Sequence, residues 1–212
     1  MLIHLIDLLP EGIPAPKNRP SVWKTELKID SSSTYMLRGT SGRGKSTFLH
    51  ILSGIRKQYK GHLEIDGINT NSFCSKKWAK IRQSSLGIVF QDLRLIPHLT
   101  ARQNLSLKGK LHAHDDTVKI QDFSSRLKVE DCLEKRCDRM SFGQQQRIAI
   151  IRALIQPFQF LLLDEPFSHL DPENIERCLK LIQEETQNQR CGYLLTTLDD
   201  DYGIKPNHYL EV

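Results

Sequence analysis

The stretch GTSGRGKST, residues 39–47, decides the fold because it fits the pattern G-x-x-x-x-G-K-[ST] at Gly39, Gly44, Lys45 and Ser46. Glycines let the chain curve tightly, so that backbone N–H groups surround a phosphate and the next helix points its N-terminus at the anion. Lys45 supplies a positive charge for the β- and γ-phosphates, and the Ser46 hydroxyl is a ligand for Mg²⁺. The stretch therefore predicts a loop that binds a nucleoside triphosphate or its diphosphate. The remaining residues of this binding loop are Thr40, Ser41, Gly42, Arg43 and Thr47.

The binding loop is predicted to lie between a strand and a helix, as its chemistry requires. The apolar run at 34–38 predicts the strand, and the apolar positions after Lys45 predict a helix that stops at Gly54. Gly192 is expected to be a break before a later strand, and the segment from about 100 to 139 is expected to be mostly helical. Further helices are predicted at 76–82, 141–156 and 172–185, and further strands at 2–8, 22–29, 62–67, 86–90, 158–165, 194–197 and 208–212. This alternation, with several uniformly apolar strands, predicts an α/β fold whose mainly parallel sheet is covered on both faces.

Composition narrows the class of protein. With 212 residues, of which 39% are hydrophobic and 26% charged, the chain is long enough for one substantial core. No stretch approaches the roughly 18 apolar residues of a membrane span, and the opening MLIHLIDLLP, which contains Asp7 and no basic region, is expected to be a strand. The five cysteines lack metal-ligand spacing, which suits a reducing cytosol. The net charge of +5 is dispersed along the chain, so no nucleic-acid partner is expected.

A second motif, FLLLDEP at 160–166, ends an apolar strand in two acids. Asp164 at the end of the strand is predicted to hold Mg²⁺, and Glu165 is placed to act as the general base that polarises an attacking water. In isolation such a pair is also typical of a strand that simply ends in two acids. Beside a triphosphate, however, two carboxylates would repel the substrate without a metal ion, so the pair predicts Mg²⁺ dependence.

The stretch MSFGQQQR, 140–147, resembles the signature motif of the ATP-binding-cassette (ABC) ATPases, which usually reads LSGGQ. Ser141, Gly143 and Gln144 match, whereas Met140 replaces the leucine and Phe142 the first glycine. Gln91 in VFQDLRLIPHLT resembles the Q-loop of that family, and SHLD at 168–171 resembles its D-loop. The motifs follow the family order from Gly39 to Leu198. The amino-acid sequence of the Q-loop region is similar to that of the cassettes that serve lipoprotein release and cell-division complexes.

The resemblance implies a fold and an assembly. It implies a P-loop NTPase core of the ABC type, with an N-terminal antiparallel β part and a small helical subdomain at about 92–155, in one nucleotide-binding domain that covers residues 1–212. It also implies ATP hydrolysis by pairs of cassettes, homodimeric or heterodimeric, that close head to tail on ATP and Mg²⁺. The partner implied is a transmembrane subunit supplied by another chain, which would hold this chain in the cytoplasm, peripheral on the inner face of the membrane.

The resemblance also implies roles for residues outside the binding loop. Ser141, Gly143 and Gln144 would contact the γ-phosphate bound by the other subunit, helped by the dipole of the helix that Ser141 caps. Gln91 would sense Mg²⁺ and the attacking water, and would connect them to the membrane partner. Asp171 would contact the other subunit across the dimer.

Two departures from the family pattern stand out. The family usually stacks adenine on an aromatic residue before the binding loop, but residues 1–22 contain no Phe, Tyr or Trp. Trp23 falls in a strand pattern and is expected to belong to the core or to a sheet surface rather than to contact the base. The residue that recognises the base, and the choice of ATP over GTP, therefore stay open.

The second departure lies at the strand after the D-loop helix, which in this family ends in Thr-His-Asp. Here the corresponding residues are Thr197, Leu198 and Asp199, and leucine makes no hydrogen bond to a γ-phosphate or a water. Losing one preorganised hydrogen-bond donor typically lowers the catalytic rate by a factor on the order of 10²–10³. Leu198 is expected to pack into the end of the sheet, and His208 could replace the histidine only if the chain folded back.

These observations leave alternative functions open. One is an ABC ATPase subunit that drives a membrane partner, with a reduced rate of hydrolysis. Another is a nucleotide-gated regulatory clamp that closes on ATP and hydrolyses it very slowly or not at all. Soluble ABC proteins that act on DNA or ribosomes are disfavoured, because the chain has one binding loop and no room for a long coiled-coil insertion between Gln91 and Ser141.

Overall fold

The computed structural model of the chain describes residues 1–14, 21–112, 116–198 and 200–212. Asp199, which completes the Thr-Leu-Asp sequence at the end of the last apolar strand, lies outside the described residues. So do residues 15–20, between the strands expected at 2–8 and 22–29.

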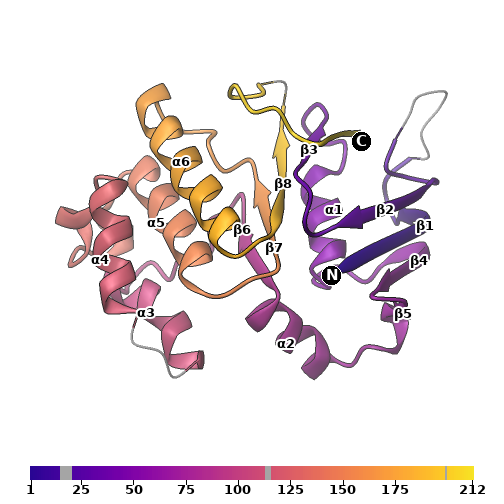
Figure 1. Cartoon of the computed structure of the whole chain (residues 1–212), viewed down its shortest axis with the longest axis horizontal. Coiled ribbons are helices and arrows are strands. Elements are labelled where there is room, and N and C mark those ends of the chain that lie inside the picture. Colours follow the sequence, from indigo (N-terminus) through magenta and orange to yellow (C-terminus); the bar gives the residue numbers. More distant parts are fainter. Residues whose placement is uncertain (15–20, 113–115, 199) are drawn as a thin grey trace.

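The larger sheet has five strands in the order β6-β7-β8-β3-β9, and each neighbouring pair is parallel (Figure 1). This confirms the predicted mainly parallel sheet. Gly192, expected to be a break, is instead the first residue of β8, where a Cβ atom would come within 1.9 Å of the Ser33 carbonyl oxygen. The strands of the larger sheet are β3 (Tyr35–Arg38), β6 (Leu86–Val89), β7 (Phe160–Asp164), β8 (Gly192–Thr197) and β9 (His208–Glu211).

The smaller sheet is antiparallel and has the strand order β2-β1-β4-β5, which confirms the predicted antiparallel β part. The strand expected at 22–29 begins only at Glu26, because Val22 and Trp23 form a turn whose side chains are buried, and Lys24 then has a φ of 54°. The strands are β1 (Leu2–Pro10), β2 (Glu26–Asp30), β4 (Tyr59–Ile65) and β5 (Ile68–Asn69).

The helices follow the predicted order, with the ends shifted by a few residues. Helix α5 begins directly after Ser141, as the capping pattern predicted. The α-helices are α1 (Lys45–Leu52), α2 (Ser75–Ser84), α3 (Ala101–His112), α4 (Thr117–Arg126), α5 (Phe142–Ile155) and α6 (Pro172–Asn188). Short 3₁₀ turns are η1 (Thr70–Ser72), η2 (Glu130–Cys132) and η3 (Cys137–Arg139).

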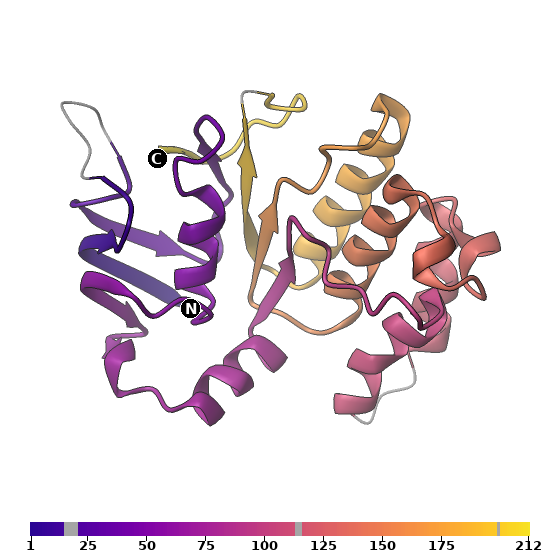
Figure 2. The ribbon, with the colours of Figure 1, turned by 180° about the vertical axis from the view of Figure 1, so that it is seen from behind.

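Alternate residues of the parallel strands point into two different cores, so both faces of the sheet are covered as predicted. Leu162 and Leu194 belong to the core that contains the apolar side of α1 and the antiparallel sheet. Leu161 and Leu195 belong to the core on the other face, beneath α5 and α6. Figures 1 and 2 show α1 between the two sheets and show α5 and α6 on the far side of the parallel sheet.

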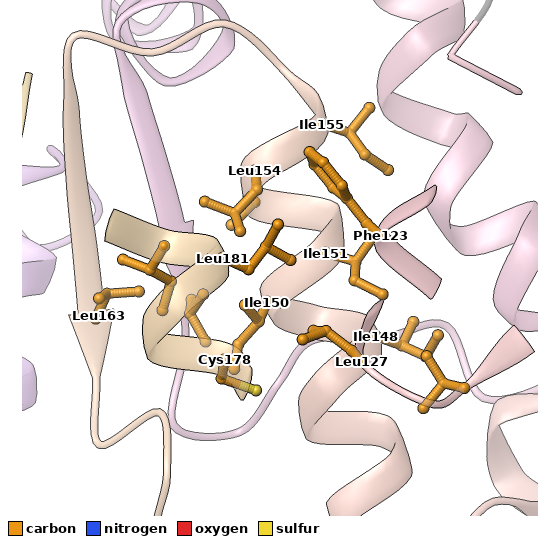
Figure 3. Packing of buried hydrophobic residues seen from close by; sticks show 14 of the residues in the cluster. Phe123, Leu127, Ile148, Ile150, Ile151, Leu154, Ile155, Leu163, Cys178 and Leu181 are labelled. Carbon is orange, nitrogen blue, oxygen red and sulfur yellow. The ribbon is translucent and has the colours of Figure 1, made fainter. Parts of the chain in front are cut away.

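The core beneath α5 and α6 continues outward into α4. Figure 3 shows Leu154 of α5 close to Leu181 of α6, and Ile151 of α5 next to Phe123 of α4. Burying each such side chain contributes roughly 1.5–3 kcal/mol. This packing fixes the direction of α5, and therefore the position of the signature residues at its start.

Among the described residues, no helix combines the length and the apolar character that crossing a membrane requires.

Candidate active site

The predicted site residues converge because four parallel strands end at the same edge of the sheet. The pairing register sets Thr197 of β8 beside Arg38 of β3, and Thr196 beside Asp164 of β7. Strand β6 ends at the same level, since its last residue pairs with Leu163. The binding loop follows β3, Asp164 and Glu165 end β7, and Gln91 follows β6. Ligands of parallel α/β sheets bind at this edge, beyond the carboxyl ends of the strands.

The binding loop curves from β3 directly into α1. Gly44 precedes the helix with a φ of 108°, and a Cβ atom there would meet the Ile13 side chain at 2.4 Å. A residue other than glycine would therefore be both strained and obstructed. The loop accordingly has the conformation that its glycine spacing predicted.

Lys45 is folded into the curve of the binding loop. Its ammonium group donates to the Gly39 carbonyl at 2.6 Å and lies 3.1 Å from Glu165 Oε1. The lysine side chain is only 4% exposed and that of Glu165 14%, so this ion pair is largely shielded from water. The group predicted to bind phosphate and the group predicted to activate water therefore form an ion pair with each other.

Asp164 is a buried carboxylate at the end of β7. Its Oδ1 accepts a hydrogen bond from Thr196 Oγ1 at 2.9 Å. Burial raises the pKa of Asp164 above its ordinary value, the hydrogen bonds from Ser46 and Thr196 work against this rise, and the charge of Glu165 adds to it. A cation beside Asp164 would compensate the cost of burying its charge.

The backbone at Glu165 is strained, with a φ of 45°. Such a conformation costs a non-glycine residue about 1–3 kcal/mol and persists only where neighbours hold it. Here the Glu165 N–H donates to Thr196 Oγ1 at 2.9 Å, and its carbonyl accepts from Gln146 Nε2 at 3.3 Å. The sequence interpretation missed both supporting residues. The two polar threonines that end the apolar strand LLTT were the available signal for Thr196.

Gln91 connects the two motifs. Its Nε2 donates to Glu165 Oε2 at 3.3 Å, and its Oε1 accepts from Ser46 Oγ at 3.2 Å. The oxygens of Ser46, Gln91 and Asp164 form a hard donor set that suits Mg²⁺, which is usually bound through one or two carboxylates together with substrate phosphates. The described residues contain no cluster of three or more His, Cys, Asp or Glu for a metal ion.

The segment after Gln91 is held by α5. Leu93 and Arg94 both have positive φ values, and Arg152 of α5 donates to both of their carbonyls at 2.6 Å. Burial lowers the pKa of Arg152 to about 10. A rigid link therefore joins the segment after Gln91 to the signature helix.

The signature residues form a regular helix start. Ser141 Oγ accepts from the Gln144 N–H at 3.2 Å, and Gln144 Oε1 accepts from the Ser141 N–H at 3.0 Å, which completes a capping box. Helix α5 packs on the face of the parallel sheet opposite to α1. The structure therefore does not bring Ser141, Gly143 and Gln144 together with the binding loop of the same chain.

Asp171 caps α6. Its Oδ1 accepts from the Asn174 N–H at 2.8 Å, and its Oδ2 accepts from the Asn174 side chain at 2.7 Å. The backbone N–H of Asn174, followed by its side-chain amide, lowers the pKa of Asp171. This capping role was not part of the sequence interpretation, and the proposed contact across a dimer stays a prediction.

The expectation that Leu198 packs into the sheet is wrong, because its side chain is 48% exposed. Strand β8 ends at Thr197, whose hydroxyl donates to the Asp200 carbonyl at 2.8 Å, so the chain turns at the sheet edge and leaves Leu198 outside. His208 cannot take the place of a histidine there. It pairs with Tyr35 at the start of β3, the end of the strand farther from the binding loop.

The expectation for Trp23 is confirmed. It is 3% exposed and meets Phe48 of α1 edge to face, with ring centroids 5.4 Å apart. Its ring is therefore part of the core, not a surface on which a base could stack.

Comparisons with known proteins agree with this geometry. The family described as "ABC transporter" matches residues 23–168. The ABC transporter ATP-binding protein YtrE of Bacillus subtilis is 34% identical over 186 residues, covering 86% of this chain and 80% of that protein. The lipoprotein-releasing system ATP-binding protein LolD of Buchnera aphidicola is 33% identical, covering 83% and 78%. A solved dimeric ATP-binding cassette in a post-hydrolysis state with ADP and Pi has a TM-score of 0.84 and 27% identity, covering 99% of this chain and 96% of that one.

Proposed function

This chain belongs to the ABC transporter family, and on that premise we propose that it is the ATP-hydrolysing subunit of a transporter-type complex. It pairs head to tail with a second cassette on ATP and Mg²⁺ and drives a transmembrane partner. The observation that supports this proposal most directly is that an ion pair and two hydrogen bonds connect four side chains at one sheet edge, those of Lys45, Glu165, Gln91 and Ser46. Residues 1–212 act as one nucleotide-binding domain, in which the segment at about 92–155 is the helical subdomain.

The contacts of Lys45 suggest how the chain prepares for hydrolysis. Its ammonium group holds Glu165 at 3.1 Å, and substrate phosphates compete with that carboxylate for the lysine. Glu165 is then released to accept a proton from the attacking water, while Gln91 keeps its hydrogen bond to the same carboxylate. Ser46, Gln91 and Asp164 would hold Mg²⁺, which would supply positive charge beside the phosphate oxygens.

The second cassette completes the site from the other side. Ser141, Gly143 and Gln144 at the start of α5 face away from their own binding loop and bind the γ-phosphate held by the other subunit. Backbone N–H groups at a helix N-terminus suit this role, and the N–H of Phe142 is retained although its side chain differs from glycine. Asp171 fixes the start of α6 at the same dimer surface.

The transmembrane partner docks in a groove of about 660 Å³ beside the Q-loop. Phe90 and Arg94 flank Gln91 and line this groove, so an occupant touches the segment that reports on the nucleotide. An apolar floor with a cationic rim fits one short amphipathic helix of the partner that carries acidic residues. The floor includes Trp78, Ile88, Phe90 and Leu107, and the rim includes Lys57, Arg82, Arg94 and Arg152.

Reversing a charge on the groove rim is expected to release the chain from membranes. Lys57 is exposed and lines the groove, and Lys57→Glu places like charges against an acidic helix, which we expect to weaken attachment about tenfold. The measurement is the fraction of the chain that sediments with membranes of the source cells. Lys60→Glu, an equally exposed lysine of β4 outside the groove, is the matched control. Equal sedimentation of the two variants would place the partner elsewhere.

The alternative function is a nucleotide-gated clamp with very slow or absent hydrolysis, and the observation that favours it is Leu198. If the chain is such a clamp, Leu198→His is expected to raise the single-turnover rate of ATP hydrolysis by up to about 10², because it adds a donor at the sheet edge where Leu198 is 48% exposed. The comparison uses purified protein at high concentration, with Glu165→Gln alongside. A wild type no faster than Glu165→Gln, although both bind ATP, would identify the clamp.

A further inference from the structure

We propose that His169 supplies, to the site of the opposite subunit, the imidazole group that Leu198 cannot provide. This inference rests on the head-to-tail pairing proposed above. It assigns a catalytic role to a residue of the D-loop segment, in contact with the γ-phosphate or the attacking water bound by the other subunit.

The first observation is that His169 is attached to the signature helix. Its imidazole lies edge to face against the Phe142 ring, with centroids 4.4 Å apart and planes at 71°. Its carbonyl oxygen lies 3.2 Å from where a Cβ atom of Gly143 would be, and its N–H donates to Gln146 Oε1 at 3.3 Å. These contacts place His169 next to Phe142 and Gly143, at the start of the helix that is proposed above to meet the nucleotide of the other subunit.

The second observation is the accessibility of the side chains involved. His169 is exposed, and Phe142 is 45% exposed at the first turn of α5. In the other copy, Leu198 is 48% exposed beyond Thr197, and its side chain has no hydrogen-bond donor. When two copies close head to tail, an exposed imidazole from one copy therefore meets the place where the other lacks one.

The third observation is that one contact connects two departures from the family pattern, namely Phe142 in the signature motif and Leu198 in place of the histidine of Thr-His-Asp. Glycine at position 142 would leave the imidazole of His169 without a ring to orient it, whereas an edge-to-face pair contributes about 0.5–1.5 kcal/mol and restricts the ring. Phe142 thus acts as a positioning residue for His169. The replacement of the glycine and the loss of the switch histidine become parts of the same arrangement.

The test is single-turnover hydrolysis by mixed dimers of two impaired variants. His169→Ala alone is expected to lower the rate by about 10², and Glu165→Gln alone to lower it by about 10³. In a mixed dimer, one site combines Glu165 from the His169→Ala subunit with His169 from the Glu165→Gln subunit. We expect the mixture to hydrolyse ATP faster than either variant alone, because that one site is complete.

The outcomes separate this inference from the proposed function. No gain on mixing would mean that His169 acts within its own subunit or only in folding, and a wild-type rate for His169→Ala would also overturn the inference. Neither result affects the proposed function, which fails instead if wild type neither binds ATP nor dimerises with it.

Leu198→His in the His169→Ala background provides a second readout: we expect the rate to return to within about tenfold of wild type. ATP-dependent dimerisation of His169→Ala/Glu165→Gln checks that the substituted loop still folds.

Discussion

Lys45→Ala is expected to abolish ATP binding at concentrations that saturate the wild type. A hydrogen bond to a charged group contributes about 1.5–3 kcal/mol, and Lys45 is proposed to bind two phosphates, so the affinity should fall by about 10²-fold or more. The measurement is equilibrium binding of ATP with Mg²⁺ by titration calorimetry. Wild-type affinity in this variant would mean that the loop at 39–47 is not the nucleotide site.

The same substitution is expected to lower the free energy of unfolding, and this effect must be separated from lost binding. Removing Lys45 leaves the Glu165 carboxylate, only 14% exposed, without its ion-pair partner. Breaking a buried pair from one side costs roughly 3 kcal/mol, at the low end of the usual range because Glu165 keeps some contact with water. The control is Lys45→Ala/Glu165→Gln, which removes the unpaired charge. We expect denaturant unfolding to show recovered stability while ATP binding stays absent.

Glu165→Gln is expected to lower the single-turnover rate of hydrolysis by about 10³ while ATP binding persists. Glutamine keeps the shape of the side chain and its contact with Gln91, but it cannot accept the proton of the attacking water. Because the ion pair with Lys45 is also lost, the lysine is free for phosphates, and ATP affinity should rise rather than fall. Rapid quenching after mixing with ATP and Mg²⁺ gives the rate.

The matched control for this prediction is Glu176→Gln, which changes an exposed glutamate of α6 that is not one of the site residues. We expect its rate and ATP affinity to equal those of wild type. If Glu165→Gln hydrolysed ATP as fast as Glu176→Gln, another group would have to be the general base. The proposal that Gln91 positions Glu165 for catalysis would then also be wrong.

Much of the site could be predicted because its chemistry depends on residues close together in the chain. The turn at Gly44, the cap at Ser141 and the carboxylates after β7 each depend on a few neighbouring residues, so their spacing specifies local backbone geometry. Strand pairing then follows from the apolar runs. Parallel strands bring their carboxyl ends to one edge, and the predicted residues meet there.

The contacts that spacing could not predict join residues far apart in the chain. Thr196 supports Glu165 from 31 positions away, Arg152 holds the turn after Gln91 from 58 positions away, and His169 meets Phe142 only because α5 and the loop before α6 pack together. Leu198 was misjudged for a different reason: an apolar residue after an apolar strand is buried or exposed according to where the chain turns, and the short-range hydrogen bond from Thr197 to Asp200 accompanies a turn directly after the strand.

The sequence by itself determined the binding loop, the two acids at the end of β7 and the mainly parallel sheet, because each of these depends on local spacing or on the apolar period of single elements. The family was indicated by the resemblance of the motifs. Only the tertiary structure decided that Lys45 holds Glu165, that Leu198 is exposed and that His169 lies against the signature helix. These contacts arise from the way helices and loops pack on the two faces of the sheet, and packing depends on many side chains at once, which no short stretch of sequence specifies.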